Sequence, residues 1–272
     1  MIIVQLSDIH LTRPGERTFD GTHDSEASTR AAIAHINNLS PQPDLILITG
    51  DIVHNGTPEE YAFASQLLSG LRAPFFVVPG NHDDRTLMAM TFSPMGALPP
   101  NHHEDSEFLQ YTIEDHPVRM IALDTSIPGE PRGNLCPRRT AWLADRLAED
   151  PDRPTLIFMH HPPMRTGIRI MDNWRCFGTE GLSDLLSLYT NVELILCGHL
   201  HRFATSVWNR HPVVIAPSSG VCVAMDLDKR DHLRLIQEPP AILVHLWEPE
   251  IGFVTHVSPI GDFPIKALEP VL

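Results

Sequence analysis

The sequence predicts an α/β fold in which a parallel, helix-covered sheet is followed by a second sheet. Three short apolar runs have the composition of buried strands, and they lie at 2–6, 44–49 and 75–78. Segments with apolar residues at helical spacing, at 25–39 and 57–71, alternate with these runs, as helices do in βαβ units. In the middle of the chain, alternating runs at 108–113 and 118–124 flank a turn and predict a hairpin that begins the second sheet.

The first half of the chain also shows where its elements begin and end. Ser40-Pro41 breaks the first helix. The second helix begins well because Pro58 occupies its first position and two glutamates follow in the first turn. Prolines at 94, 99 and 100 predict a loop-rich segment over 85–106. We therefore expect a helix after each of the first two strands and a loop after the third.

The second half predicts helices at 138–149 and 181–189. Strands are predicted at 155–159, 192–196, 213–216, 241–247 and 252–257, the last three as antiparallel strands. The connection 217–240 is long and poorly periodic, and such connections are usually functional or disordered. Its apolar residues predict burial, either as a cap over a site or in a contact with another subunit. We expect the whole chain, 1–272, to form a single catalytic domain that contains this insertion.

The charge balance limits the kinds of partner and substrate that the protein can bind. Lys and Arg together number 20 and Asp and Glu 34, which gives a formal net charge of −14. A surface that follows a phosphate backbone needs clustered basic residues, so we expect no long nucleic acid as a partner. A small anionic substrate is compatible with this charge where metal ions supply local positive charge. The 16 histidines point the same way, because histidine is the commonest side-chain metal ligand near neutral pH.

Cysteine spacing and apolar runs indicate the compartment. Cys136, Cys176, Cys197 and Cys222 are widely spread and form no Cys-x-x-Cys pattern, which favours reduced, structural thiols. The chain opens directly with a strand rather than with a secretory leader. No apolar run reaches the ~20 residues of a membrane helix. We therefore expect a soluble, cytoplasmic protein without a membrane partner.

Metal-competent side chains follow five of the predicted strands at the point where each strand ends. They are Asp8 and His10, Asp51, Asn81 and His82, His160, and His199 and His201. Open α/β sheets place their sites at the carboxyl ends of strands, and side chains two apart on a strand face the same way. Turn chemistry could explain one such end, but not five. Imidazoles combined with carboxylate and amide oxygens suit two metal ions such as Fe, Mn, Zn or Co.

The order of these blocks is Asp-x-His, Gly-Asp, Gly-Asn-His-Asp, His and Gly-His-x-His, and it resembles the calcineurin-like metallophosphoesterase superfamily over residues 1–201. Three longer stretches, Gly-Asp-Ile-Val, Pro-Gly-Asn-His-Asp-Asp and Phe-Met-His-His-Pro-Pro, resemble its bacterial glycerophosphodiesterase and class III cyclic-nucleotide phosphodiesterase branch. The resemblance implies a four-layer α-β-β-α sandwich, in which two mixed sheets are flanked by helices and the site lies at one edge.

The resemblance also implies a role for each residue. Asp8, His10 and His201 would hold one metal ion, and Asn81, His160 and His199 a second, with Asp51 bridging the two. Two ions ~3.5–4 Å apart can share a hydroxide that attacks phosphorus, and can clamp the attacking and leaving oxygens. Because the amide of Asn81 adds no charge, we expect the second ion to bind more weakly. His82 would stabilise charge on the phosphate or protonate the leaving alkoxide, and it forms the expected catalytic pair with Asp51.

Three further residues are weaker candidates. His161 would point to the opposite face if its strand continued, which favours a core or supporting role. His54 is the best candidate for substrate contact, although a solvated loop histidine is the commoner outcome. Phe19 lies in the loop after Asp-x-His, where the resembled branch places residues that line the substrate.

The resemblance implies hydrolysis of small phosphodiesters, such as glycerophosphodiesters and cyclic nucleotides. The alternatives are a phosphomonoesterase of the same superfamily and a non-catalytic scaffold, and the complete set of seven ligands argues against the scaffold. A monoester brings an extra negative charge, which is usually met by Arg or Lys. The nearest arginines lie just outside the motifs, at Arg13, Arg85, Arg165 and Arg202. Members of the branch often form homo-oligomers through their C-terminal part, so we expect a dimer or larger.

Overall fold

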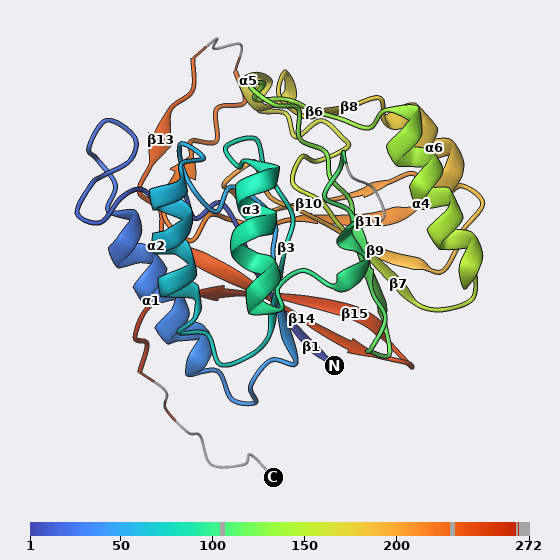
Figure 1. Ribbon diagram of the computed structural model, residues 1–272, viewed down its shortest axis with the longest axis horizontal. Helices are drawn as coiled ribbons and strands as arrows, with labels where there is room; N and C mark the ends of the chain where they lie inside the picture. Colours follow the sequence, from blue (N-terminus) through green and yellow to red (C-terminus); the bar gives the residue numbers. More distant parts are fainter. Residues whose placement is uncertain (104–106, 229–231, 265, 267–272) are drawn as a thin grey trace.

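Two β-sheets pack face to face, and helices cover both outer faces (Figure 1). The structure is a computed structural model, and it describes residues 1–103, 107–228, 232–264 and 266. The main helices are α1 (Ser25–Asn37), α2 (Pro58–Leu68), α3 (Arg85–Phe92), α4 (Pro137–Glu149) and α6 (Thr179–Leu186). The first three lie against one sheet and the last two against the other. The predicted fold, with two mixed sheets flanked by helices, is confirmed.

The first sheet joins the beginning of the chain to a late hairpin. Its strands are β1 (Ile2–Leu6), β2 (Leu45–Ile48), β3 (Phe75–Val77), β14 (Ala241–Glu248) and β15 (Gly252–Pro259). Their order in the sheet is β15-β14-β1-β2-β3. The first three strands are parallel, as the βαβ pattern predicted, and Ile3 of β1 lies opposite Leu45 of β2. β14 pairs antiparallel with both β1 and β15, so the predicted antiparallel pair at the end of the chain is confirmed.

The second sheet contains the predicted hairpin and the later strands. Its members are β4 (Tyr111–Ile113), β5 (Arg119–Ala122), β7 (Thr155–Phe158), β9 (Val192–Cys197), β10 (Ala204–Trp208) and β11 (His211–Ile215). The order is β10-β11-β9-β7-β5-β4, and β4 pairs antiparallel with β5 as predicted. The antiparallel strand predicted near 213–216 is confirmed as β11, which also pairs in parallel with β9 on its other side. Its antiparallel partner is β10, a half-exposed edge strand whose weak apolar pattern gave no signal.

Alternate side chains of the second sheet enter two different cores. Leu156 and Phe158 of β7 face the first sheet and belong to the same hydrophobic cluster as its strands. Ile157 and Met159 pack in the core that α4 and α6 cover. Side chains alternate across a strand, so a strand buried on both faces reads as a continuous apolar run. This is why 155–159 was recognisable from composition alone.

The loop predicted over 85–106 is wrong in its first part, because α3 begins at Arg85. The side chain of Asp84 accepts a hydrogen bond from the backbone N–H of Leu87, which caps the helix. The helix then ends before Pro94, and two short 3₁₀ turns follow, η1 (Ser93–Met95) and η2 (Pro100–His103). Residues 104–106 of this prediction lie outside the described residues.

The long segment 217–240 contains a small hairpin. Its strands are β12 (Cys222–Val223) and β13 (Leu235–Ile236), which pair antiparallel. Residues 229–231 of this segment lie outside the described residues. In Figure 1 the hairpin lies at the same end of the molecule as α5 (Arg169–Asp172). A second small pair, β6 (Gly133–Asn134) and β8 (Cys176–Phe177), lies beside α5.

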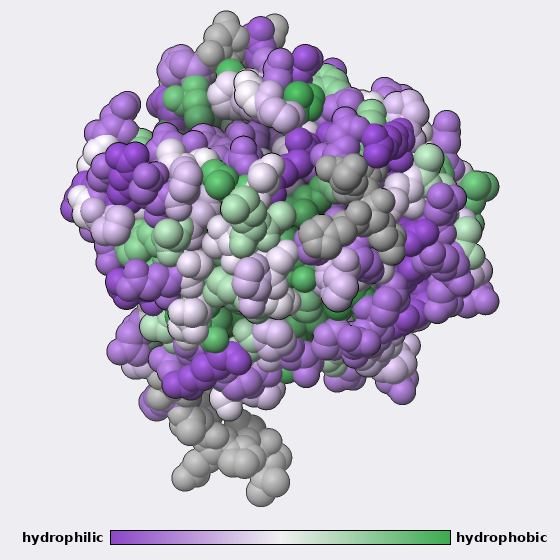
Figure 2. Space-filling view, viewed as in Figure 1, coloured by the Kyte–Doolittle hydropathy of each residue, from purple (hydrophilic) through white to green (hydrophobic). Residues whose placement is uncertain are grey.

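The surface drawn in Figure 2 is mixed. Hydrophilic residues dominate its rim, and hydrophobic residues are interspersed near the middle. Such mixing is ordinary for a protein surface in contact with water. In the part of the chain that the structure describes, no helix combines the length and the apolarity needed to cross a bilayer.

Candidate metal centre

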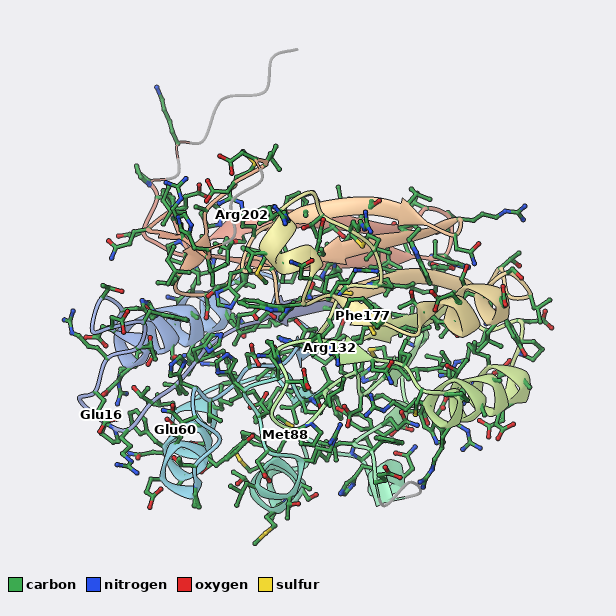
Figure 3. All side chains as sticks on the ribbon, turned by 90° about the horizontal axis from the view of Figure 1, so that it is seen from above. Glu16, Glu60, Met88, Arg132, Phe177 and Arg202 are labelled. Carbon is green, nitrogen blue, oxygen red and sulfur yellow. The ribbon has the colours of Figure 1, made fainter. Side chains whose placement is uncertain are left out.

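The predicted strand ends meet at one edge of the sandwich, where both sheets contribute loops. The loops that follow β1, β2, β3 and β9 line a cavity of about 260 Å³. His160, which follows β7, lies against two of the lining residues, Asp51 and Asn81. Figure 3 looks onto this end of the molecule from the side of α5 and β13. The seven candidate ligands are therefore together in space, although they are spread over nearly two hundred residues of sequence.

The backbone, rather than strand alternation, aims the candidate ligands. β1 ends at Leu6 and β9 at Cys197, so the residues of both Asp-x-His and His-x-His lie beyond their strands. Five of the ligands have a left-handed backbone: φ is 54° at Asp8, 51° at His10, 51° at Asp51, 69° at His199 and 55° at His201. Such conformations cost about 1–3 kcal/mol each and persist only where the surroundings enforce them. The sequence analysis expected Asp8 and His10 to face the same way because side chains alternate along a strand. Their common direction comes instead from the left-handed backbone beyond the strand.

Glycines allow these loops to approach one another closely. Gly50 has φ +90°, and a Cβ on it would lie 2.4 Å from Nδ1 of His160. A Cβ on Gly80 would lie 2.2 Å from Oδ1 of Asp51. Both contacts are shorter than any side chain tolerates, so the glycines of Gly-Asp and Gly-Asn-His-Asp are required for the packing of the ligands.

The candidate ligands form two groups that meet at Asp51. Oδ2 of Asp51 is 3.5 Å from Nε2 of His10 and 3.2 Å from Nε2 of His160. In the first group, Nε2 of His201 is 3.1 Å from Nε2 of His10 and 3.4 Å from Oδ1 of Asp8. One carboxylate thus stands between an imidazole of each group, which is the position that a bridging ligand occupies.

The second group joins His160 to an amide and to another histidine. Oδ1 of Asn81 is 3.2 Å from Nε2 of His160. The rings of His160 and His199 are 5.1 Å apart between centroids. The backbone N–H of His199 donates to the carboxylate of Asp8 at 3.0 Å, and this contact ties the second group to the first.

Backbone carbonyls fix the orientation of two candidate ligand rings. Nδ1 of His160 lies 2.8 Å from the carbonyl oxygen of Thr49, and Nδ1 of His201 lies 2.9 Å from that of Val221. A carbonyl can only accept a hydrogen bond, so Nδ1 carries the proton in both rings. Each Nε2 then faces the carboxylates, as a metal-ligating nitrogen does when its other nitrogen donates to the protein.

The donor atoms fit metal ions. Ligand atoms of Asp8, His10, Asp51 and His201 all lie within 4.8 Å of one another, and these four residues are buried. Nε2 of His199 is buried and has no hydrogen-bond partner among the described residues. An unpaired buried nitrogen and two buried carboxylates are costly without a cation. The mixture of imidazole, carboxylate and amide donors suits borderline metals.

The two carboxylates differ in their electrostatic environment. Burial raises the pKa of Asp8 above its usual range. Burial would also raise the pKa of Asp51, but the neighbouring His160 and His82 hold it well below that range. Burial would lower the pKa of His160, but the Asp51 carboxylate raises it to about 9. Asp51 is therefore held in its ionised, ligand-competent form.

His82 presents one nitrogen to the cavity. Its Nδ1 donates to the carbonyl oxygen of His54 at 2.7 Å, and its backbone N–H donates to Oδ1 of Asp51 at 2.9 Å. Because Nδ1 is engaged, Nε2 is the atom free to exchange a proton in the cavity, which His82 lines. The ring of His54 stacks on that of His82, with centroids 5.1 Å apart.

The three weaker candidates lie close to the centre. Nδ1 of His54 is 3.2 Å from Nδ1 of His10, and His54 is not among the residues that line the cavity. Phe19 does line it. β7 ends at Phe158, so strand alternation does not set the direction of His161, which is buried and lies 2.8 Å from the hydroxyl of Thr125 through its Nδ1. The centroid of the His161 ring is 4.5 Å from that of His199.

Sequence reasoning missed two kinds of support for the site. Asp83 accepts hydrogen bonds from the backbone N–H groups of Gly80 at 2.9 Å and Ile52 at 3.3 Å, and so ties two ligand loops together. Its place inside Gly-Asn-His-Asp was an available signal. Residues 218–221 give the second kind: the hydroxyl of Ser218 donates to the carbonyl oxygen of Asp8 at 2.8 Å, close to the Val221 carbonyl that orients His201. No local pattern marked that stretch.

The nearby arginines are engaged or exposed, and none of them lines the cavity. Arg85 donates to the carboxylate of Asp124. Arg202, labelled in Figure 3, donates to the carbonyl oxygen of Val223 at 2.8 Å and to Glu238 at 2.9 Å. Arg13 lies 3.9 Å from Glu59, and Arg165 is exposed. Among the described residues that line the cavity there is therefore no guanidinium.

This fold, with these donor types at its edge, is that of a metallophosphoesterase. Residues 1–203 match the calcineurin-like phosphoesterase family, and the chain belongs to that family. The chain resembles a dimetal phosphatase from Danio rerio with a TM-score of 0.65 and 12% identity, over 96% of this chain and 99% of that one. At this identity the likeness concerns the fold alone.

Two curated relatives share more sequence identity with this chain than the Danio rerio structure does. A probable glycerophosphodiester phosphodiesterase, GpdQ, of Arcobacter nitrofigilis is 41% identical over 264 residues, which cover 97% of this chain and 94% of that protein. The 3′,5′-cyclic adenosine monophosphate phosphodiesterase CpdA of Escherichia coli K12 is 28% identical over 219 residues, 80% of this chain and 76% of that protein. The chain is accordingly a hydrolase of phosphate esters, with phosphodiesterases among its relatives.

Proposed function

We propose that this chain is a dinuclear-metal-dependent phosphodiesterase that hydrolyses small phosphodiesters. The observation that carries the proposal is the meeting of two donor groups at the Asp51 carboxylate. In the first group, Asp8, His10 and His201 hold one ion. In the second, Asn81, His160 and His199 hold the other, and Asp51 bridges the two. The donor chemistry is compatible with Fe, Mn, Zn or Co.

The chain's own residues would orient the substrate and move a proton. When bound, the two ions supply Lewis acidity and a nucleophile at neutral pH. His82 donates a proton from Nε2 to the leaving alkoxide, because Nδ1 is held by the carbonyl oxygen of His54. The hydrogen bond from the His82 backbone to Asp51 fixes the position of that ring relative to the ligands. Asn81 contributes an uncharged ligand, which makes the second ion the more weakly held.

The lining of the cavity supports a diester rather than a monoester. The described lining residues include no Lys or Arg to meet the second charge of a monoester. The formal net charge of −14 also disfavours the more anionic substrate. The relatives named as glycerophosphodiester and cyclic-nucleotide phosphodiesterases support the same choice.

The decisive experiment compares both substrate classes on metal-reconstituted enzyme. Chelator-treated protein is loaded with Mn, Co, Zn or Fe, and kcat/KM is measured for bis(p-nitrophenyl) phosphate and for p-nitrophenyl phosphate. We expect activity to return with added metal and to favour the diester. A clear preference for the monoester would support the phosphomonoesterase instead. No turnover with two bound metals would support the scaffold, and full activity without metal would contradict the two-metal mechanism.

We also propose that the single catalytic domain assembles as a homo-oligomer in the cytoplasm. The exposed apolar side chains of Phe203 (44%) and Ile251 (57%) line a groove of about 650 Å³ between strands of the two sheets. The four free cysteines support a reducing compartment. Sedimentation at micromolar concentration tests the assembly, and a strictly monomeric mass would contradict it.

A further inference from the structure

The cavity at the metal centre has two walls of different chemistry. The candidate ligands and His82 form a polar wall. The facing wall is apolar, and its members are Phe19, Pro131, Met171, Trp174, Val223, Leu233 and Leu235. Apart from the metal-site residues, no described residue that lines the cavity carries a charge, a hydroxyl or an amide in its side chain. A substrate held on the polar wall by its phosphate therefore meets apolar atoms on the other side.

Four separate segments build this apolar wall. Phe19 comes from the loop after β1 and Pro131 from the connection between β5 and β6. Met171 and Trp174 come from α5 and its end, and the three remaining residues come from the β12–β13 hairpin. Met171 and Val223 are buried, with 5% and 2% exposure. Leu233 and Leu235 each keep 37% exposure, so they offer apolar surface that the protein itself does not cover.

The hairpin that carries Leu235 is held in place over the site. Arg202 directly follows the candidate ligand His201, and its guanidinium bonds Val223 on the first strand of the hairpin and Glu238 just after the second. The main chain at Val221 orients His201 as well. The hairpin part of the apolar wall is therefore hydrogen-bonded to the loop that carries His201, which sets its position relative to the metal site.

The chemistry of the wall discriminates between the ester groups of small diesters. The hydroxyls of glycerol would lose water there without gaining a partner, which is unfavourable. A flat ring would bury apolar area and stack against the aromatic side chains of Phe19 and Trp174. The cavity of about 260 Å³ lies below the ~300–1,000 Å³ of sites for drug-sized ligands. It accommodates one ring-sized group beside the phosphate.

We propose that this wall is a subsite for an aromatic ester group, so that the enzyme selects nucleoside or aryl phosphodiesters over glycerophosphodiesters. The inference rests on the proposed function, because it places the phosphate on the metal-site residues. It assigns the choice of substrate to residues outside the metal-binding motifs, above all Trp174 and Leu235.

Product inhibition tests the subsite without interference from leaving-group reactivity. Glycerol 3-phosphate, phenyl phosphate and adenosine 5′-monophosphate carry the same phosphate group and differ in the attached alcohol. Their inhibition constants are measured on the metal-loaded enzyme against methyl p-nitrophenyl phosphate, and their dissociation constants by calorimetry. We expect phenyl phosphate and adenosine monophosphate to bind about tenfold more tightly than glycerol 3-phosphate. Equal binding of all three would overturn the proposal.

Paired variants locate the effect on the wall. Leu235→Ser and Trp174→Ala should each reduce the preference for the ring about threefold and raise KM for aryl diesters with kcat and metal content unchanged. Ile236→Ser is the matched control, because Ile236 is the next residue of the same strand, is exposed (42%) and does not line the cavity. A preference that survives both wall variants, or that the control abolishes equally, would overturn the assignment.

The proposed function and this inference fail in different ways. If methyl p-nitrophenyl phosphate is not hydrolysed by enzyme with two metals, the phosphodiesterase itself is wrong. If that diester is hydrolysed but the ring gives no advantage in binding, only the subsite is wrong. Thermal unfolding of each variant shows whether it has kept its fold, so that a damaged protein is not mistaken for a specificity change.

Discussion

At the residue scale, Asp51 is the point on which the candidate centre depends. Its carboxylate lies within 3.5 Å of an imidazole from each donor group and accepts a hydrogen bond from the backbone of His82. A neutral side chain at this position would leave His160 without its counter-charge and the two metal positions without a shared ligand. Substitution of Asp51 should therefore reduce metal binding and turnover more than substitution of an ordinary surface carboxylate does.

We predict that Asp51→Asn and Asp51→Ala abolish binding of the metal pair, because the bridge is lost. Elemental analysis after gel filtration measures the metal content, and the diester assay measures turnover. Asp184→Asn is a suitable control, since Asp184 is exposed on α6, away from the cavity. Two tightly held metals and near-normal turnover in Asp51→Ala would contradict the assignment.

Substitution of His82 should lower the rate of catalysis without affecting metal binding. We predict that His82→Ala keeps both metals but loses about 10²–10⁴-fold in kcat, the usual contribution of general acid–base catalysis. The loss should shrink for aryl oxide leaving groups, which need little help from an acid. A loss of the same size across a series of leaving groups would point to positioning of the phosphate instead.

The sequence was informative about which residues gather, but not about how they are aimed. Residue type and position at strand ends predicted the seven-residue cluster around Asp51. The left-handed backbone at Asp8 and His199 was not predictable, because nothing local distinguishes it from ordinary loop geometry. It is enforced by contacts between loops far apart in sequence, such as the bond from the backbone N–H of Asp8 to the carbonyl oxygen of Gly50.

At the scale of elements, strong periodicity and caps predicted most helices, and the misses have local causes. Capping at Thr57 and Pro58 marked the start of α2 clearly. The prolines at 94, 99 and 100 masked α3, although they all follow its last residue, Phe92. The β12–β13 hairpin has two-residue strands, which no pattern of period two can reveal. Its position comes from tertiary contacts.

We predict that Arg202→Met loosens the β12–β13 hairpin while β9 stays intact, because two anchors of the hairpin are lost. Hydrogen exchange, followed by mass spectrometry, should show faster exchange over the described parts of 222–238 and unchanged exchange in β9. Arg165→Met is the control for loss of an exposed arginine. Unchanged exchange in the hairpin would mean that its own pairing holds it.

At the scale of the whole molecule, buried histidines make stability depend on pH. Burial lowers the pKa of His245 to about 3, and its ring lies between Thr255 Oγ1 at 2.8 Å and Gln5 Oε1 at 3.2 Å. In the unfolded chain this side chain titrates near its ordinary value of 6.5. Between these two values the unfolded state binds the extra proton, so the stabilisation is complete above pH 6.5 and is lost as the pH falls toward 3.

We predict that His245→Gln flattens this acid dependence by about 1.4 kcal/mol per pH unit between pH 6 and 4. Urea unfolding at several pH values gives the slopes for the wild type and the variant, and buried histidines that both share cancel in the difference. His256→Gln on β15 is the control, because His256 is exposed. Parallel curves for wild type and His245→Gln would show that His245 does not titrate as its burial requires.

Because β14 pairs with β1, a chain truncated before β14 would leave one edge of β1 without its partner strand. A ribosome delivers β1 first and β14 only after residue 240 has been made. Until then one side of an uncharged strand, Ile2–Leu6, exposes its backbone N–H and C=O groups to any neighbouring chain. A fragment of residues 1–203 would contain every candidate ligand and the whole family match, yet it would lack the strand that closes this edge. We expect this truncated chain to be found in the insoluble fraction after expression. The β14–β15 hairpin therefore prevents self-association by covering the edge of β1.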